Sequence, residues 1–457
     1  MNSNAKIKSI FKMTPSKVIL LGFAAVILIG AFLLCLPISN VDRQWIPFVD
    51  ALFTSTTSVC VTGLMVFDIA AKLSLFGEFV VLFLIQIGGL GFVTMTAFAF
   101  MIIGKKINYS TRITLQEALS KDDNEGVVKM VIRVLKITFI CEGFGILFLL
   151  PSMIEFSGDF WSGLFKSVFL SVSAFCNAGI DPLGTATADF SNLAYFASNP
   201  FVLIPVMCLI VIGGIGFVVI LDIFDFSKRP KKLNIHSRIV LWVTLSLILF
   251  GAGTFMIFEW NNPDTIGLFS TGDKIMNSFF QSITTRTAGF ATFDQGSMTT
   301  VSIVVSLFLM FVGGSPMSIA GGLKTTTFFV LLLLLFKNPD VNGNIIYKNK
   351  KISHQVRTKA VKLALIAVTL VLVGSIILYL FEGSAITLTS AIYDVVSAIC
   401  TVGLSFGITP TLCLGSKITL ILLMYIGRIG MLTIPLAFKP KESNISIDYV
   451  NAKIIVG

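Results

Sequence analysis

Eight apolar segments, each long enough to cross a lipid bilayer as a helix, constrain this chain more than any other feature. They lie at residues 17–38, 76–103, 127–150, 200–224, 236–258, 301–336, 358–381 and 417–438. A helix needs about 20 apolar residues to span a hydrocarbon core of roughly 30 Å. The 457 residues are 55% hydrophobic and only 13% charged, too few charges to cover a soluble fold of this length. The sequence therefore predicts an all-α integral membrane protein with eight transmembrane helices.

A shorter apolar segment lies between the two members of each successive pair of long ones. These four segments are 49–60, 163–176, 273–285 and 388–400, and each runs into a glycine. They are too short to cross the bilayer, so we interpret them as re-entrant pore helices that dip into the membrane and return. The predicted architecture is four helix–pore loop–helix repeats around a pseudo-fourfold axis, with the bounds 17–103, 127–224, 236–336 and 358–438.

Basic residues gather in the segments that connect these repeats. Of the 34 Lys and Arg residues, 26 lie in the N-terminal segment, in or beside three inter-repeat loops, and in the C-terminal tail. The opposite loops carry mostly acidic residues, such as Asp42, Asp68, Glu155, Asp181, Asp264 and Glu382. The positive-inside rule then places both termini and the basic loops in the cytoplasm. The predicted cytoplasmic segments are 1–16, 104–126, 225–235, 337–357 and 439–457.

Several classes of function find no support in the sequence. The basic residues follow the membrane topology and form no aromatic-interleaved stretch, which argues against nucleic-acid binding. We find no HExxH pattern, nucleophile elbow or GxGxxG fingerprint, so neither an enzyme nor a nucleotide site on this chain is expected. An ion-coupled secondary carrier stays open, because such carriers place ionisable relays at mid-membrane. Glu142 is the one plausible relay, and a paired structural carboxylate is the competing interpretation.

An internal repeat at the four short segments is the main functional signal. The stretches read FTSTTSVCVTGL (53–64), FLSVSAFCNAGI (169–180), FQSITTRTAGF (280–290) and YDVVSAICTVGL (393–404). Their glycines, Gly63, Gly179, Gly289 and Gly403, are separated by 116, 110 and 114 residues. An aromatic residue precedes each glycine by ten positions: Phe53, Phe169, Phe279 and Tyr393. Agreement at several registers, four times over, indicates a fourfold structural unit.

Four such loops around one axis are suited to binding a dehydrated cation. Each short helix would point its partially negative C-terminal end toward the axis. The residues that follow can then expose a line of backbone carbonyls, as in potassium-channel filters. Glycine is needed because a Cβ disfavours the backbone dihedrals that aim successive carbonyls inward. We predict a K⁺ filter made of Val61, Thr62, Gly63, Asn177, Ala178, Gly179, Thr287, Ala288, Gly289, Thr401, Val402 and Gly403.

The sixth apolar segment, 301–336, is expected to break in its middle. At 1.5 Å per residue its 36 residues would form a helix of about 54 Å, which is longer than the bilayer is thick. The stretch 313–322 holds four glycines and a proline, and proline costs about 3 kcal/mol in a helix interior. We therefore predict a mid-membrane loop beneath the filter, while a simple kink is the alternative.

Two arginines stand out near these elements. Arg428 occupies the position at which the other repeats have Gly89, Gly214 and Gly314. An arginine within an apolar segment costs at least about 2.5 kcal/mol unless it is paired or faces water, so we expect Arg428 to face the permeation path. Arg286 lies beside the third filter loop, where it either pairs with an outer acid such as Asp294 or influences the ions.

These motifs resemble the Trk/Ktr/HKT superfamily of potassium transporters, most closely the KtrB membrane subunits. The resemblance covers nearly the whole chain and rests on the four filter loops, the IGGLGF/IGGIGF/IGRIGM series and GGSPMSIAGGLKTTT. It implies that the broken sixth segment is an intramembrane gate. The gate residues it implies are Gly313, Gly314, Ser315, Pro316, Ser318, Gly321 and Gly322, with Lys324 as a weaker candidate, and we add Arg428. A serine at the first filter position accompanies sodium transport in the plant branch, so Gly63 favours potassium.

The resemblance also implies partners and a location. It implies potassium uptake, with sodium as a possible coupled ion, by a homodimer in a bacterial plasma membrane in contact with lipid. It further implies a cytosolic ring of nucleotide-binding, KtrA-like regulatory subunits. The C-terminal tail 439–457 ends in an apolar stretch, which suits docking on such a partner or a free terminus.

Overall fold

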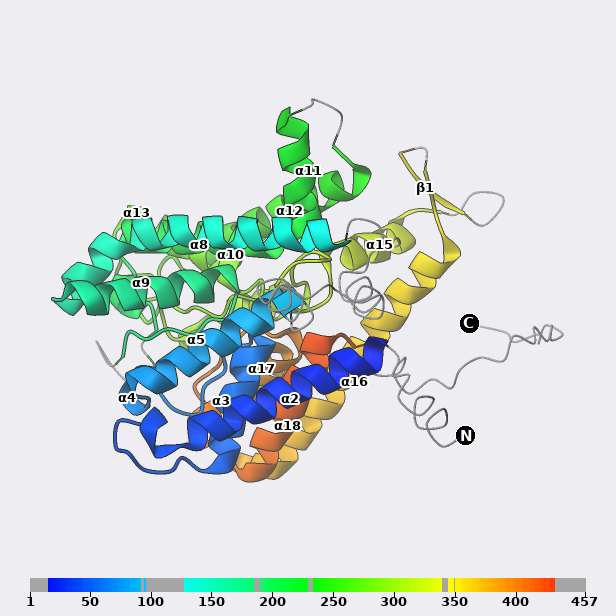
Figure 1. Cartoon of the computed structure of the whole chain (residues 1–457). Coiled ribbons are helices and arrows are strands. Elements are labelled where there is room, and N and C mark those ends of the chain that lie inside the picture. The colour runs from blue at the N-terminus through cyan, green and yellow to red at the C-terminus, as the bar shows by residue number, and fades with distance from the viewer. Residues whose placement is uncertain are drawn as a thin grey trace, which may run out of the picture.

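The computed structural model describes residues 15–91, 94–95, 127–184, 190, 192–228, 233–338, 344–348 and 350–431. Within them the chain is mostly helical, and the helices pack side by side in one bundle (Figure 1). Repeat 1 contains α2 (Pro15–Cys35), α3 (Phe48–Cys60), α4 (Ile69–Lys72) and α5 (Leu75–Leu90). Repeat 2 contains α8 (Val127–Ser157), α9 (Phe160–Phe175), α10 (Pro200–Ile215) and α11 (Phe217–Lys228). Repeat 3 contains α12 (Ile235–Glu259), α13 (Thr271–Thr284), α14 (Thr300–Phe311) and α15 (Thr325–Phe336). Repeat 4 contains α16 (His354–Glu382), α17 (Leu388–Cys400) and α18 (Leu414–Ile429).

The helix that opens each repeat is long and the helices that follow it are shorter. We call α3, α9, α13 and α17 the short helices, and α5, α10, α14 and α18 the second helices, of the four repeats. Four of the described helices are long and apolar enough to cross a membrane, or five if the bent pair α10–α11 counts as one span. The four are the helices that open the repeats: α2, α8, α12 and α16. The eight predicted spans therefore stay a prediction.

Glycines in the left-handed region of φ end three of the second helices. Gly91, Gly216 and Gly430 follow α5, α10 and α18 with φ of 85°, 97° and 103°. The prediction of one continuous helix over 200–224 is wrong, because the chain turns by 97° between α10 and α11. Figure 1 shows α11 leaving the bundle at this bend. In repeats 1 and 4 the residues after these glycines lie largely outside the described ranges.

The chain is not purely α-helical. A two-stranded antiparallel hairpin, β1 (Ile345–Tyr347) and β2 (Lys350–Ile352), lies in the segment 337–357 that we predicted as a loop. The helix that follows begins at His354, four residues before the predicted span. The N-terminal segment up to residue 14, the loop 104–126 and the tail 439–457 lie outside the described residues.

In three of the repeats the short helix is held against the long helix that opens the repeat by a hydrogen bond and close packing. In repeats 1 to 3 a serine of the short helix donates a hydrogen bond to a carbonyl of the long helix, at 2.7–2.8 Å. A glycine of the long helix lies beside each serine, and an added Cβ there would overlap its hydroxyl. The serine–carbonyl–glycine sets are Ser55–Ile27–Gly30, Ser171–Glu142–Gly145 and Ser282–Ile248–Gly251. These contacts fix the depth of each short helix.

The structure corrects the predicted register of the third repeat. Phe53, Phe169 and Tyr393 are fully buried as the aromatic of their short helices, but in repeat 3 the fully buried ring is Phe280. Phe279 is only partly buried. The third repeat is thus one residue shorter between its aromatic and its glycine. The bonding serine follows the aromatic by two positions in repeats 1 to 3, including Ser282 after Phe280, which explains why Phe280 is the equivalent residue.

Candidate functional site

The site is built where the four short helices end. In each repeat the residue two positions before the landmark glycine adopts the left-handed conformation, although it is not glycine. These residues are Val61, Asn177, Thr287 and Thr401, with φ of 55°, 56°, 71° and 51°. Such φ values are uncommon outside glycine and mark a backbone held by its surroundings. We call the stretches 61–63, 177–179, 287–289 and 401–403 the glycine loops.

The glycine loops meet in a closed ring. An added Cβ on each landmark glycine would lie within 2.6 Å of a carbonyl oxygen in the next repeat. Gly63 faces the carbonyl of Ala178, and Gly179 that of Ala288. Gly289 faces the carbonyl of Val402, and Gly403 that of Thr62, which closes the circle. Because the positive φ and the neighbouring backbone both exclude a side chain, only glycine fits these four positions.

Side-chain hydroxyls of the short helices hold the glycine loops from behind. The hydroxyls of Thr57 and Ser397 accept hydrogen bonds from the N–H groups of Gly63 and Gly403, each at 2.9 Å. The Ser173 hydroxyl accepts from the N–H of Ile180 at 3.1 Å. These bonds occupy amide N–H groups of the loops and stabilise their backbone conformation.

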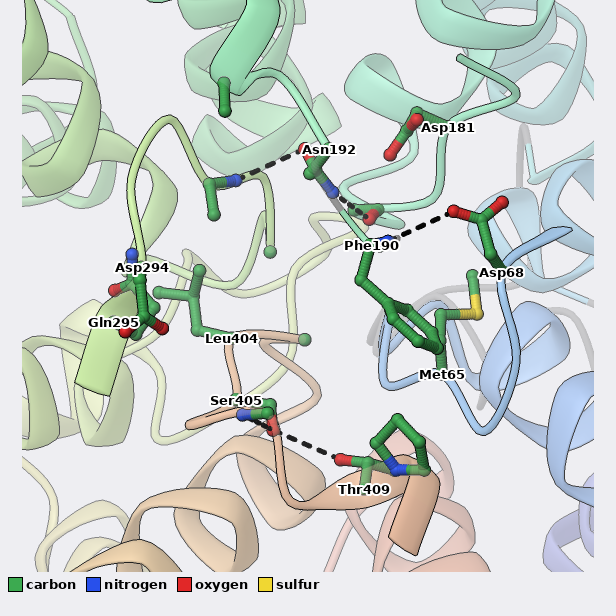
Figure 2. A pocket seen from close by; sticks show the side chains of 18 of the residues that line it. Met65, Asp68, Asp181, Phe190, Asn192, Asp294, Gln295, Leu404, Ser405 and Thr409 are labelled. Atoms are coloured by element: carbon green, nitrogen blue, oxygen red, sulfur yellow. Dashed lines mark hydrogen bonds between the residues drawn. The ribbon is translucent and has the colours of Figure 1, made fainter. Parts of the chain in front are cut away.

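A cavity of about 460 Å³ opens directly onto the ring of glycines. All four landmark glycines line it, together with the acidic residues Asp68, Asp181 and Asp294. Figure 2 shows these carboxylates distributed around the cavity, on segments that follow the glycine loops of three repeats. A cavity with this lining attracts cations and offers no positive side chain among its lining residues.

The carboxylates of the cavity differ in environment. Asp68 accepts hydrogen bonds from the N–H groups of Ala71 and Phe190, at 3.1 and 3.2 Å; the second is drawn in Figure 2. Burial raises the pKa of the Asp181 carboxyl to about 7. The N–H of Leu183 opposes this rise in pKa, and the Asp68 charge adds to it. Asp181 therefore titrates near neutral pH, at the entrance to the glycine ring.

The other side of the ring faces the loop between α14 and α15. Residues 312–324, the α14–α15 loop, separate the two helices, so the predicted break in the sixth segment is confirmed. The loop is largely buried and hydrogen-bonds to the end of α10, since Ser315 N–H donates to the Gly214 carbonyl at 3.0 Å. An added Cβ on Gly321 would overlap the Thr401 hydroxyl and the Cys400 carbonyl. The loop thus lies against the fourth glycine loop.

Arg428 connects this loop to the first repeat. Its guanidinium donates hydrogen bonds to the backbone carbonyls of Ile319, Gly88 and Gly89. The bond to Gly89 measures 3.2 Å. Ile319 belongs to the α14–α15 loop, and the two glycines lie in the last turn of α5. The side chain therefore bridges three repeats at the level of the broken helix, where carbonyls need donors.

Two further cations bond to the same loop. The ammonium of Lys324 donates to the Ala320 carbonyl inside the loop. Arg286 is almost fully buried, and its Nη2 donates to the Gly313 carbonyl at 3.2 Å. The alternative in which Arg286 pairs with Asp294 is wrong, because Asp294 caps a short turn and accepts from Gly296 and Ser297. The residues that line the cavity lie at or after the landmark glycines in the chain. Because Arg286 precedes Gly289, its place in the sequence already indicates the side of the ring that faces the α14–α15 loop.

Glu142 is buried in α8 with 4% of its surface exposed. One carboxylate oxygen accepts a hydrogen bond of 3.4 Å from the Gln86 amide. The other oxygen has no hydrogen-bond partner among the described residues. The side-chain oxygen Oε1 of Gln86 in turn accepts a hydrogen bond from the Cys176 thiol at 3.8 Å. Glu142 thus lies behind the second glycine loop with a neutral amide as its partner.

Comparisons with known proteins agree with one another. The sequence profile described as "TrkH: Cation transport protein" matches residues 12–447. The chain is 37% identical over 460 residues to the potassium/sodium uptake protein NtpJ of Enterococcus hirae, with 98% of each chain covered. It is 36% identical over 448 residues to the Ktr system potassium uptake protein B of Bacillus subtilis, covering 98% of this chain and 97% of the relative. The crystal structure of the potassium transporter TrkH from Vibrio parahaemolyticus aligns with a TM-score of 0.71 at 17% identity, over 94% of this chain and 86% of that one. At this identity the structural match shows a shared fold.

Proposed function

Since the chain belongs to the TrkH family of cation transport proteins, we propose that it mediates potassium uptake through one selective pore. The four glycine loops are the filter of this pore. The observation that carries the proposal is the closed ring in which each landmark glycine faces a carbonyl of the next repeat. Backbone carbonyls at several successive levels can replace the hydration shell of K⁺, the solution used by potassium channels.

The cavity on one side of the filter is the outer entrance in this proposal. Its acidic residues raise the local concentration of cations before they lose their water. The negative C-terminal ends of the four short helices add to this attraction on the axis. Relatives named for potassium uptake and for potassium/sodium uptake support K⁺ as the main ion and Na⁺ as the second candidate.

The α14–α15 loop is the gate in this proposal. It lies on the side of the ring opposite the cavity and bonds to Arg428, Arg286 and Lys324 through its backbone carbonyls. Three cations close to the axis repel an ion that leaves the filter. The loop also supplies a physical barrier, and Gly313, Gly314, Gly321 and Gly322 give it a backbone that can rearrange.

The assembly we propose is a homodimer in a bacterial plasma membrane, with eight spans per chain and both termini in the cytoplasm. The clustered basic residues on the predicted cytoplasmic side support this orientation. Regulation would come from a cytosolic ring of nucleotide-binding subunits, because the sequence of this chain carries no nucleotide fingerprint. Removal of that ring should change the open fraction of the gate and leave ion selectivity unchanged.

Flux measurements on purified protein in lipid vesicles test the proposal. Potassium and rubidium should permeate faster than sodium, without a requirement for an organic solute. Equal flux of all three ions would contradict the filter assignment. Potassium movement that requires a second, organic substrate would instead identify an ion-coupled carrier, in which Glu142 would be the candidate relay.

A further inference from the structure

Arg286 joins the third glycine loop to the α14–α15 loop. It lies three residues before Gly289, and 7% of its surface is exposed. Its Nη2 bonds to the Gly313 carbonyl at 3.2 Å. Gly313 follows Val312, whose bridge to Leu323 brings the two ends of the loop together. One side chain therefore connects the third glycine loop of the proposed filter to the first residues of the proposed gate.

The other charged side chains that bond to this loop come from different places. Arg428 reaches Ile319 from α18, and Lys324 bonds within the loop itself. Among the described charged side chains that bond to the α14–α15 loop, Arg286 is the one that stands next to a glycine loop in the chain. The backbone of Thr287, which has a left-handed φ of 71°, begins immediately after it.

A small cavity lies beside the Arg286 side chain. It measures about 20 Å³ and is lined by residues of α10, α12 and α13 and by Gly314. Thr244 of α12 lines it too. The Nε of Arg286 and the hydroxyl of Thr244 are both buried without a hydrogen-bond partner among the described residues. A cavity above about 10–15 Å³ with two or more polar partners can hold one water molecule. A water here would accept from Nε and bond the threonine hydroxyl, and so remove two costly unsatisfied groups.

We propose that Arg286, together with one water molecule in this cavity, couples ion occupancy of the filter to the position of the gate loop. This inference rests on the proposed function. An ion that holds the carbonyls of the third loop inward also holds the backbone of Arg286. Loss of the Gly313 carbonyl would leave the buried guanidinium charge uncompensated, which is costly. Gly313 therefore moves together with the Arg286 side chain. Coupling of this kind is reciprocal, because the gate position changes ion affinity by the same factor. Arg286 is a positioning residue in this role and does not touch the ion.

The experiment measures the gate position in the presence and absence of a filter ion. A cysteine at Ser318→Cys reports the loop, in full-length protein whose exposed Cys208 and Cys413 are replaced by serine. Its reaction rate with a water-soluble thiol reagent is measured in vesicles that contain either K⁺ or choline. We expect labelling to be about tenfold slower in K⁺, a ratio that corresponds to one charged hydrogen bond. In Arg286→Gln the ratio should fall close to one.

Matched variants separate coupling from a merely structural role. Arg286→Lys keeps the charge and should retain part of the ratio. Thr244→Val should also lower the ratio of labelling rates, but by a several-fold smaller factor than Arg286→Gln does, because in this variant only the water loses a hydrogen-bond partner. Thr254→Val is the control, since its hydroxyl bonds within the same helix, to the Phe250 carbonyl, and the ratio should not change.

Two results would overturn the coupling. One is a ratio of the labelling rate in choline to that in K⁺ that is unchanged in Arg286→Gln, or, if that variant does not fold, unchanged in both Arg286→Lys and Thr244→Val. The other is a ratio of labelling rates of one in the parent protein, although the parent protein transports K⁺ in the same vesicles. The parent's K⁺ flux distinguishes this failure from that of the proposed function, because a parent that carries no K⁺ contradicts the pore itself.

Discussion

Arg428 and Ile319 lie 109 positions apart in the chain, and a hydrogen bond from the arginine guanidinium to the isoleucine carbonyl joins them. The same guanidinium bonds to carbonyls at the end of α5. A single side chain of the fourth repeat thus satisfies backbone groups that the broken helix of repeat 3 and the end of α5 in repeat 1 leave open. At membrane depth such groups need partners inside the protein.

Replacement of Arg428 by alanine should therefore raise potassium flux, by about tenfold or more. The variant removes charged hydrogen bonds worth about 1.5–3 kcal/mol each and a positive charge near the exit of the filter. Arg428→Lys should fall between the two proteins, because lysine keeps the charge and loses the planar fork. Rubidium uptake into vesicles measures the effect. If both variants fold and transport like the parent, Arg428 is only a structural anchor.

Replacement of Gly289 by serine should lower potassium affinity or the preference for potassium over sodium. The added side chain meets the Val402 carbonyl and a backbone with a φ of 81°, which disturbs the carbonyl ring. Gly253→Ser is the matched control, because an added Cβ there meets no atom within 4 Å. Competition between rubidium and sodium in uptake assays reports the change. Unaltered competition in a well-expressed Gly289→Ser protein would count strongly against the filter.

Deletion of residues 316–320 from the α14–α15 loop should raise flux and remove the dependence of that flux on the regulatory subunit we propose. The deletion shortens the barrier and takes away the carbonyls that Arg428 and Lys324 bond. Uptake is compared with and without the proposed nucleotide-binding ring. A folded deletion protein with lower or unaltered flux would sink the gate assignment.

Potassium uptake should depend on external pH near neutrality through Asp181. Burial raises the pKa of its carboxyl to about 7, so the group is charged above that pH and becomes neutral as the pH falls through it. Loss of one negative charge at the entrance should weaken apparent potassium affinity roughly threefold at low ionic strength. Asp181→Asn should show the weaker affinity at every pH. A pH profile that is identical in the parent and in Asp181→Asn would assign the effect elsewhere.

Replacement of Glu142 by glutamine tests the remaining carrier alternative. Glutamine is nearly isosteric, and its side-chain oxygen can still accept a hydrogen bond from the Gln86 amide, as the carboxylate does. If Glu142 has only a structural role, the glutamine variant should show flux within about twofold of the parent. It should also fold at least as stably as the parent, because a buried ionisable group is replaced by a neutral one. Abolished transport, with proton movement lost at the same time, would favour a coupled carrier.

The sequence alone predicted four repeats, located the four landmark glycines and predicted the break in the sixth apolar segment. These features depend on local physics: segment length, the conformational range of glycine and the exclusion of proline from helix interiors. The family could be recognised from the same motifs. The candidate filter residues could be named from the sequence, because the four stretches align with one another and each carries a glycine at the same place.

The tertiary structure alone decided how these parts close on one another. It showed the bend after α10, the shorter register of repeat 3 and the ring of contacts from Gly63 to Gly403. It also assigned Arg286 to the Gly313 carbonyl rather than to Asp294. The physical reason is that backbone carbonyls carry no signature in the sequence. Which carbonyl each arginine satisfies depends on how the chain packs: the acceptor of Arg286 lies 27 positions away and the acceptors of Arg428 lie 109 or more positions away.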